Sequence, residues 1–165
     1  MADWTLVASV DFDSLSVPHR RLSIYRAMSA SPGSGPITFA FSSQVSNVEW
    51  IVSQWDGVET SGVNGAGAIR QSGSNRADAT NALSVALAPF GNANNVALGA
   101  FAVNSQVLTI TPGSGFSEID EQAANEGTRG DLQGEWAVNR ATVTASWSNL
   151  RGAALGIEIK ARAGS

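Results

Sequence analysis

The residue types that could do chemistry in this chain are few, and its single histidine comes first. A Ser-His-Asp or Cys-His site would have to use His19. This histidine lies between Val17-Pro18 and Arg20-Arg21, which is typical of a polar loop between two strands. No G-x-S-x-G motif is present to supply a nucleophile. We therefore expect His19 to be a solvated loop residue, and we predict that the chain has no catalytic residues and is not an enzyme.

Carboxylate pairs are the second possible source of chemistry, because two carboxylates at the right separation hydrolyse glycosidic bonds. The candidate sets are Asp11/Asp13, Asp56/Glu59, Glu118/Asp120/Glu121 and Glu135/Glu158. A spacing of two on a strand places both side chains on one face, which is equally expected of a solvent-facing strand. A glycan hydrolase is therefore the weakest of the functional hypotheses.

Metal and phosphate sites have little support in the sequence. The run Asp11-Phe12-Asp13 could supply part of a calcium site, but no alternating series of acids follows it. One histidine and no cysteine argue against a transition-metal site, and the lack of cysteine excludes disulfides. The run Gly62–Gly67 lacks the Gly-Lys-Ser/Thr ending of a phosphate loop. We expect no cofactor and no metal, with calcium at Asp11 and Asp13 left open.

Tryptophan is frequent for a chain of this size, and its five positions are Trp4, Trp50, Trp55, Trp136 and Trp147. Exposed tryptophans anchor protein interfaces or stack on sugar rings, whereas most tryptophans fill cores. On a regular strand Trp50 and Trp55 have opposite parity, so one of them is expected to face outward. We predict Trp4, Trp55 and the adjacent Asp56 as partner-binding residues.

Length and charge narrow the functional classes. The chain has 165 residues, which suits one domain, and only 15% of them are charged, with a net charge of −4. The arginines are scattered and form no basic stripe, so nucleic-acid binding is not expected. No apolar run approaches the ~20 residues of a membrane helix, and Met1–Trp4 does not begin a signal peptide. We expect neither a membrane-bound nor a nucleic-acid-binding protein.

Apolar residues recur at every second position in many short segments, as in Ile37-Thr38-Phe39-Ala40-Phe41. This period of two indicates strands, and their separation by Gly, Pro, Asn and Ser clusters predicts an all-β, antiparallel, jelly-roll-like two-sheet sandwich. We expect strands near 4–10, 22–28, 37–42, 48–55, 81–88, 95–103, 106–110, 116–122, 132–138, 141–147 and 153–161. Segments 48–55 and 95–103 are apolar on both faces and are expected to be central strands or strands whose outer face contacts a partner. One helical turn is predicted at Glu121–Glu126.

We expect residues 1–165 to form one domain made of two weakly similar sub-units, about 1–57 and 81–162. Residues 58–80 are rich in Gly, Ser and Asn, and they are predicted to be the long surface loop that joins the sub-units. Two strands precede Phe116 in the second sub-unit, whereas none precedes Trp4 in the first. This difference predicts an open sheet edge near the N-terminus that a neighbouring subunit or another partner covers.

Several segments together resemble a known group of modules. They are Trp4–Val7, Arg21–Arg26, Ile37–Phe39, Trp50–Val58, Asn94–Phe101, Thr109–Pro112 and Phe116. The pattern is similar to that of β-sandwich modules in tailed-bacteriophage virion proteins and related bacterial surface proteins, although this chain starts directly at the W-T-L-V-like strand. The resemblance implies a virion protein, assembled in the host cytoplasm, that serves as capsid decoration, head fibre or tail component. It transfers no catalytic residue.

The leading hypothesis is therefore a non-enzymatic structural protein of a phage particle that binds other virion subunits and forms a homo-oligomer. The alternative is a carbohydrate-binding or adhesin module on a phage or bacterial surface, which would be extracellular and would bind a glycan.

Overall fold

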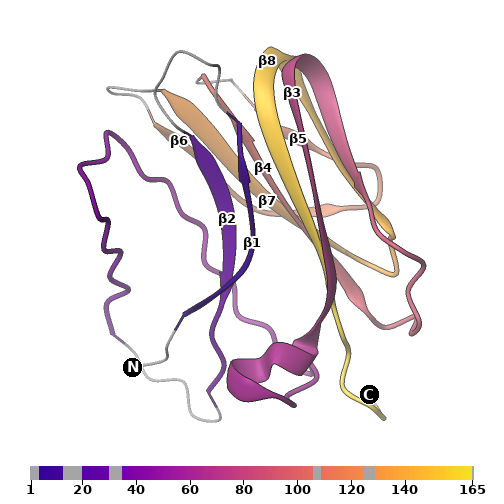
Figure 1. Cartoon of the computed structure of the whole chain (residues 1–165). Coiled ribbons are helices and arrows are strands. Elements are labelled where there is room, and N and C mark those ends of the chain that lie inside the picture. The colour runs from indigo at the N-terminus through magenta and orange to yellow at the C-terminus, as the bar shows by residue number, and fades with distance from the viewer. Residues whose placement is uncertain (1–3, 13–19, 30–34, 106–108, 125–128, 165) are drawn as a thin grey trace.

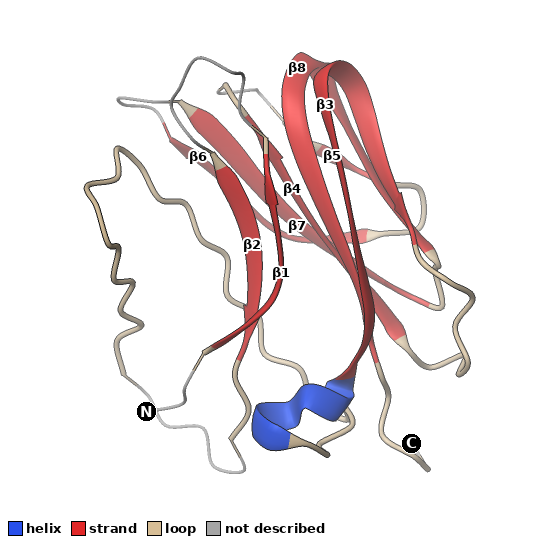
Figure 2. Cartoon of the chain, viewed as in Figure 1, coloured by secondary structure: helices blue, strands red, loops and turns tan. Residues whose placement is uncertain are grey.

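The computed structural model describes residues 4–12, 20–29, 35–105, 109–124 and 129–164, and nearly all of their regular structure is β (Figures 1 and 2). The strands of these residues are β1 (Thr5–Asp11), β2 (Arg21–Arg26), β3 (Ile69–Ala86), β4 (Val96–Val103), β5 (Thr111–Pro112), β6 (Ser117–Ala124), β7 (Gly130–Val138) and β8 (Thr142–Ile159). A 3-10 helix, η1 (Val63–Ala68), leads into β3.

Two antiparallel sheets form the sandwich. The larger sheet has the strand order β3-β8-β4-β7-β6, with β5 paired to β8, and the smaller sheet consists of β1 and β2. The small sheet covers one face of the large one, where Phe12 and Leu22 pack against Ala102, Ala153 and Leu155. The predicted jelly-roll-like two-sheet sandwich is confirmed.

The opposite face of the large sheet is covered by the second half of β3 and the first half of β8, which fold back over it. Strands β3 and β8 pair from Ile69–Ile159 to Ala86–Thr142, and register shifts interrupt the ladder between Ala77 and Ala82. Beyond these shifts the ribbon turns over at the top of the molecule (Figure 1). A core of buried apolar side chains, including Val85, Val143 and Phe101, fills the space between its two halves and the neighbouring strands.

A row of three glycines makes this close packing possible. Gly73 of β3, Gly156 of β8 and Gly99 of β4 are register partners across the sheet. A Cβ on Gly156 would lie 2.7 Å from Val143 Cγ2, and one on Gly73 would lie 2.8 Å from Val85 Cγ1. The absence of side chains in this row therefore lets the folded-over half of the ribbon rest directly on the sheet.

Most of the predicted strands are present. The segments near 4–10, 22–28, 95–103, 116–122 and 132–138 correspond to β1, β2, β4, β6 and β7, and β4 is central as expected. Segment 81–88 is the second half of β3. The segments 141–147 and 153–161 are the two halves of one long strand, β8.

Five expectations from the sequence differ from the structure of the described residues. Segments 37–42 and 48–55 contain no strand, because period-two alternation does not bring a ladder partner into reach. The predicted loop 58–80 instead contains η1 and the first half of β3. Residues 121–124 of the predicted helix 121–126 belong to β6, where pairing with β7 overrides local preference. Residues 109–110 of segment 106–110 precede β5, and residues 106–108, 125 and 126 lie outside the described part.

The first half of β3 was missed because polar and small side chains serve a structural purpose there. The Gln71 side chain donates to the Ala88 carbonyl at 2.9 Å and accepts from the Ala88 N–H at 2.8 Å. The Asn75 amide donates to the Ser84 carbonyl at 2.9 Å. These side chains fasten the folded-over half of the ribbon, so the segment lacks the apolar alternation that marks a half-buried strand.

Candidate binding surface

Residues 35–56, which we call the limb, are the most unusual part of the described chain. They contain no strand, and much of this segment forms an irregular trace at the left of the molecule (Figure 1). Ile51 Cδ1 lies 3.6 Å from the position of a Cβ built on Gly134 of β7. The rings of Trp55 and Trp136 meet edge to face with centroids 5.8 Å apart. The limb is therefore anchored over β7 by side-chain packing without belonging to a sheet.

Exposed apolar side chains are concentrated in the N-terminal third of the chain. Nine of the eleven large hydrophobic residues that are exposed in the described structure lie between residues 4 and 52: Trp4, Leu6, Tyr25, Ile37, Phe39, Phe41, Val45, Trp50 and Val52. Trp50 is 55% exposed, and its ring lies 5.6 Å from that of Phe39. A concentration of exposed apolar side chains of this kind is typical of a binding site or an aggregation hazard.

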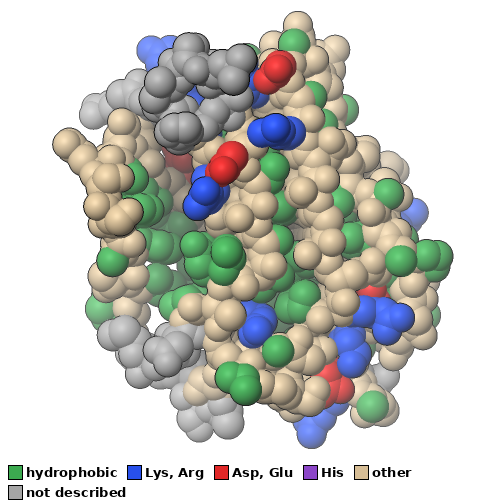
Figure 3. Space-filling view, viewed as in Figure 1, with side chains coloured by type: hydrophobic (Ala, Val, Ile, Leu, Met, Phe, Trp, Pro, Cys, Tyr) green, Lys and Arg blue, Asp and Glu red, His purple; other side chains and the backbone are tan. Residues whose placement is uncertain are grey.

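A groove separates the limb from β6. It has a volume of about 540 Å³ and is lined by residues 47–52 of the limb together with Asp120, Gln122, Ala123 and Ala124 of β6. We refer to the space between these residues as the limb groove. The space-filling view shows hydrophobic side chains gathered beside the limb on the face that carries β1 and β2 (Figure 3).

One acidic residue of β6, Asp120, lines the limb groove. Glu118 and Glu121 pair in register with the buried Glu135 and Gln133 and lie on the opposite face of β6. Burial raises the pKa of Glu121, although its carboxylate accepts a hydrogen bond from the Ile110 N–H at 2.6 Å. On the limb, burial also raises the pKa of Glu49, and this effect outweighs the attraction of Arg20. The groove therefore combines apolar and acidic groups.

The three predicted partner-binding residues occupy different surroundings. Trp4 is exposed just before β1, and Asp56 is exposed at the end of the limb. Trp55 is half-buried, and its Nε1–H donates to Ser53 Oγ at 2.8 Å. The more exposed of the two limb tryptophans is Trp50, which was not among the predicted partner-binding residues, and because the segment contains no strand this exposure does not follow from strand parity. The Phe39–Trp50 contact joins two segments that local patterns treat separately.

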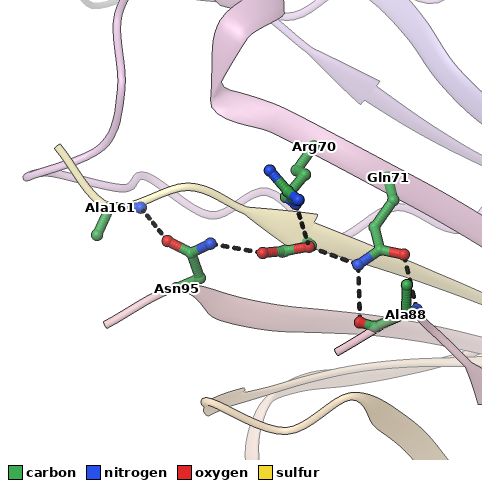
Figure 4. A network of polar contacts seen from close by, with 6 residues as sticks. Arg70, Gln71, Ala88, Asn95 and Ala161 are labelled. Carbon is green, nitrogen blue, oxygen red and sulfur yellow. Dashed lines mark hydrogen bonds and ion pairs between the residues drawn. The ribbon is translucent and has the colours of Figure 1, made fainter. Parts of the chain in front are cut away.

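Glu158 is a buried structural carboxylate. Its side chain is fully buried and accepts hydrogen bonds of 2.5 Å each from Gln71 Nε2 and Asn95 Nδ2, while Arg70 Nε lies 3.6 Å away (Figure 4). Asn95 extends the network by accepting the Ala161 N–H at 3.0 Å. Both carboxylate oxygens are thus committed to neighbours from β3 and the strand ends.

Glu135 is also fully buried, on β7 beneath the loop that contains β5. Loss of solvent raises the pKa of Glu135 to about 7, even though the Gly113 N–H donates to its Oε2 at 3.0 Å. Neither Glu135 nor Glu158 lines the limb groove. Both carboxyl groups are thus buried in the core.

The remaining chemical candidates can be placed only in part. Asp11 forms an ion pair with Arg21, with N–O distances of 2.7 and 3.2 Å, whereas Asp13 and His19 lie outside the described residues. Within the described chain, no three His, Cys, Asp or Glu side chains cluster closely enough to hold a metal ion. The same residues include no helix of the length and apolarity that crossing a membrane requires.

Fold and surface together define an antiparallel β-sandwich with an apolar limb and a groove between that limb and β6. No family model, curated protein or solved structure matches this chain.

Proposed function

We propose that this chain is a non-enzymatic structural protein of a bacteriophage particle, acting through protein–protein contacts as capsid decoration, head fibre or tail component. The observation that carries the proposal is the concentration of exposed apolar side chains in residues 4–52. A soluble monomer rarely exposes a large contiguous apolar patch without a partner to cover it. The resemblance of the strand motifs to virion modules supplies the class of partner.

Association with particles tests this proposal. Particles released by the organism that encodes the chain are banded in a density gradient, and the bands are probed with an antibody against the chain. The chain should band with particles and remain there after a high-salt wash, because apolar contacts are not weakened by screening. Its recovery only in the soluble fraction would contradict the proposal.

Two variants test the surface itself. Trp50→Ser combined with Phe39→Ser should reduce co-banding at least tenfold, because the two rings are exposed and lie against each other as one aromatic anchor. Val138→Ser is the matched control, since Val138 is similarly exposed on β7 but lies outside residues 4–52. Equal loss in both variants would argue that hydrophobicity anywhere on the surface is sufficient.

A carbohydrate-binding or adhesin module is the second candidate, favoured by the half-exposed ring of Trp50 beside Phe39. Aromatic faces of this kind can stack on sugar rings. A glycan array would support this function if binding to particular sugars disappeared in Trp50→Ala. Retention of glycan binding in that variant would place the sugar site elsewhere.

A further inference from the structure

We propose that two copies of this chain associate by pairing residues 36–42 of the limb with the same residues of the other copy, as antiparallel strands about a two-fold axis. This inference rests on the proposed function, because it names a second copy as one partner of the same exposed surface. The reasons are the unused backbone of the segment, its lack of charge, and the symmetry of its apolar side chains.

The backbone of this segment is available for pairing. Its sequence has the alternation of a strand, with Ile37, Phe39 and Phe41 separated by small or polar residues. Every residue from 35 to 47 is exposed, and no backbone-to-backbone hydrogen bond joins residues 36–42 to another described residue. Figure 1 shows the segment within the outermost trace on the left of the molecule. A second strand can therefore reach its amides and carbonyls from outside the molecule.

Charge permits a second copy at the limb and opposes one at β6. Residues 35–48 contain no charged side chain, so two copies of this segment can face each other without repulsion. Strand β6, which ends the order of the large sheet, carries three acidic residues and no basic one. Like charges across a strand pair are destabilising, so β6 is protected against pairing with its own copy and the limb is not.

The side chains of the segment are complementary to themselves. A two-fold axis at Phe39 places Phe39 opposite its own copy and Ile37 opposite Phe41. Residues directly opposite each other in an antiparallel pair project to the same side, so the apolar side chains of both copies form one row. The Trp50 ring, with its centroid 5.6 Å from that of Phe39, extends this row over the limb. An uncharged segment is recognised mainly by its apolar spacing, and the identical segment matches that spacing at every position.

Pro36 determines which residues form the hydrogen bonds. In an antiparallel pair, hydrogen-bonded and non-hydrogen-bonded residue pairs alternate. Pro36 has no N–H and would lie opposite Ser42, so these two residues must form a non-hydrogen-bonded pair. Within residues 37–41, the odd-numbered amides then bond to the other copy, and the even-numbered amides point away from it.

Sedimentation velocity and amide exchange of the full chain test this inference. Seven residues from each copy make a small interface, and interfaces below about 1,200 Å² are typical of weak complexes. We therefore expect a monomer at about 2 μM and chiefly a dimer at about 200 μM. At the higher concentration, exchange of the odd-numbered amides of residues 37–41 should be at least tenfold slower, while exchange of the even-numbered amides should be unchanged.

A pair of variants locates the two-fold axis. Phe39→Lys and Phe39→Glu should each remain monomeric at the higher concentration, because like charges would face each other at the axis. An equimolar mixture of the two should dimerise again, because opposite charges then face each other. Phe39 is exposed, so neither substitution disturbs the buried core.

The matched control is the pair Val138→Lys and Val138→Glu, because Val138 is 49% exposed against 44% for Phe39. Each control variant should dimerise by itself like the unmodified chain. A chain that is monomeric at the higher concentration, a mixture of Phe39 variants that does not dimerise, or slower exchange of the even-numbered amides would each overturn the inference.

These results are separable from those on the proposed function. A chain that bands with phage particles but remains monomeric at the higher concentration would retain the virion role and refute the self-pairing of the limb. A chain that dimerises through Phe39 but is absent from particles would retain the self-pairing and refute the virion role.

Discussion

A fully buried glutamate beside a fully buried glutamine is an unusual pair for the interior of a sandwich. Glu135 and Gln133 project from β7 toward the folded-over ribbon, and Glu118 is the register partner of Glu135 on β6. Burial disfavours the charged carboxylate, so the pKa of Glu135 rises to about 7. The folded protein therefore holds a proton there that the unfolded chain releases near its ordinary pKa.

This difference predicts a stability that depends on pH. Because the folded-state pKa is the higher one, the stabilising effect of the proton is complete below about pH 4.5 and is lost as pH rises to about 7. The loss amounts to about 3 kcal/mol for a shift of this size. Glu135→Gln, a neutral isostere, should be more stable than the unmodified chain at pH 8 and similar to it at pH 4.5.

Urea unfolding at several pH values between 4.5 and 8 measures this effect. The burial-raised pKa values of Glu49 and Glu121 act in the same direction, so some pH dependence should remain in the variant. An identical slope of unfolding free energy against pH in both proteins would show that Glu135 does not carry the effect.

At the scale of elements, the doubling-over of the β3–β8 ribbon distinguishes this sandwich from two separate sheets. The bend lies at the register shifts between Ala77 and Ala82, and the glycine row sets how closely the two layers approach. A side chain in that row would have to displace a buried valine. Overpacking of this kind costs about 1–3 kcal/mol.

A double-mutant cycle tests the glycine row. Gly156→Ala places a methyl group 2.7 Å from Val143 Cγ2 and should destabilise the protein by about 1–3 kcal/mol. Val143→Ala leaves a cavity when made alone, but it removes the clash when combined with Gly156→Ala. The combined cost should therefore be at least 1 kcal/mol below the sum, and strict additivity would contradict direct packing. Gly91→Ala, where a Cβ meets no atom closer than 3.8 Å, is the control.

The same elements show what the sequence could and could not predict. Strands such as β4 and β8 alternate or are apolar throughout, so their side chains report their burial directly. The first half of β3 is difficult to predict because it contains polar or small residues such as Gln71, Gly73 and Asn75. These residues contact a layer that later residues form by folding back over the sheet. The limb has the opposite character, because its alternation is that of a strand while its backbone lacks a partner. Local patterns could not distinguish these cases.

On the scale of the whole molecule, the sequence predicted partner-binding residues near the N-terminus and at Trp55 and Asp56, but it could not predict the groove between the limb and β6. That groove depends on contacts between segments that are distant in the sequence. Trp50 illustrates the limit, since its exposure follows from the placement of Ile51 and Trp55 over β7.

The limb should open far more readily than the body to which it is attached. Segments without ladder hydrogen bonds unfold locally at low free-energy cost, and proteases cut such segments first. Limited digestion with chymotrypsin should therefore cleave after Phe39, Phe41 or Trp50 before it cleaves after Tyr25. Tyr25 is the internal control, because its side chain is 49% exposed against 44% for Phe39 while its backbone is paired within β2.

Exposure alone would make Tyr25 and Phe39 equally susceptible, so the ratio of the two cleavage rates isolates the contribution of strand pairing. Mass spectrometry of early time points should show the limb fragments at least tenfold in excess. Equal yields of fragments from both sites would show that side-chain exposure, and not strand pairing, sets the cleavage rate.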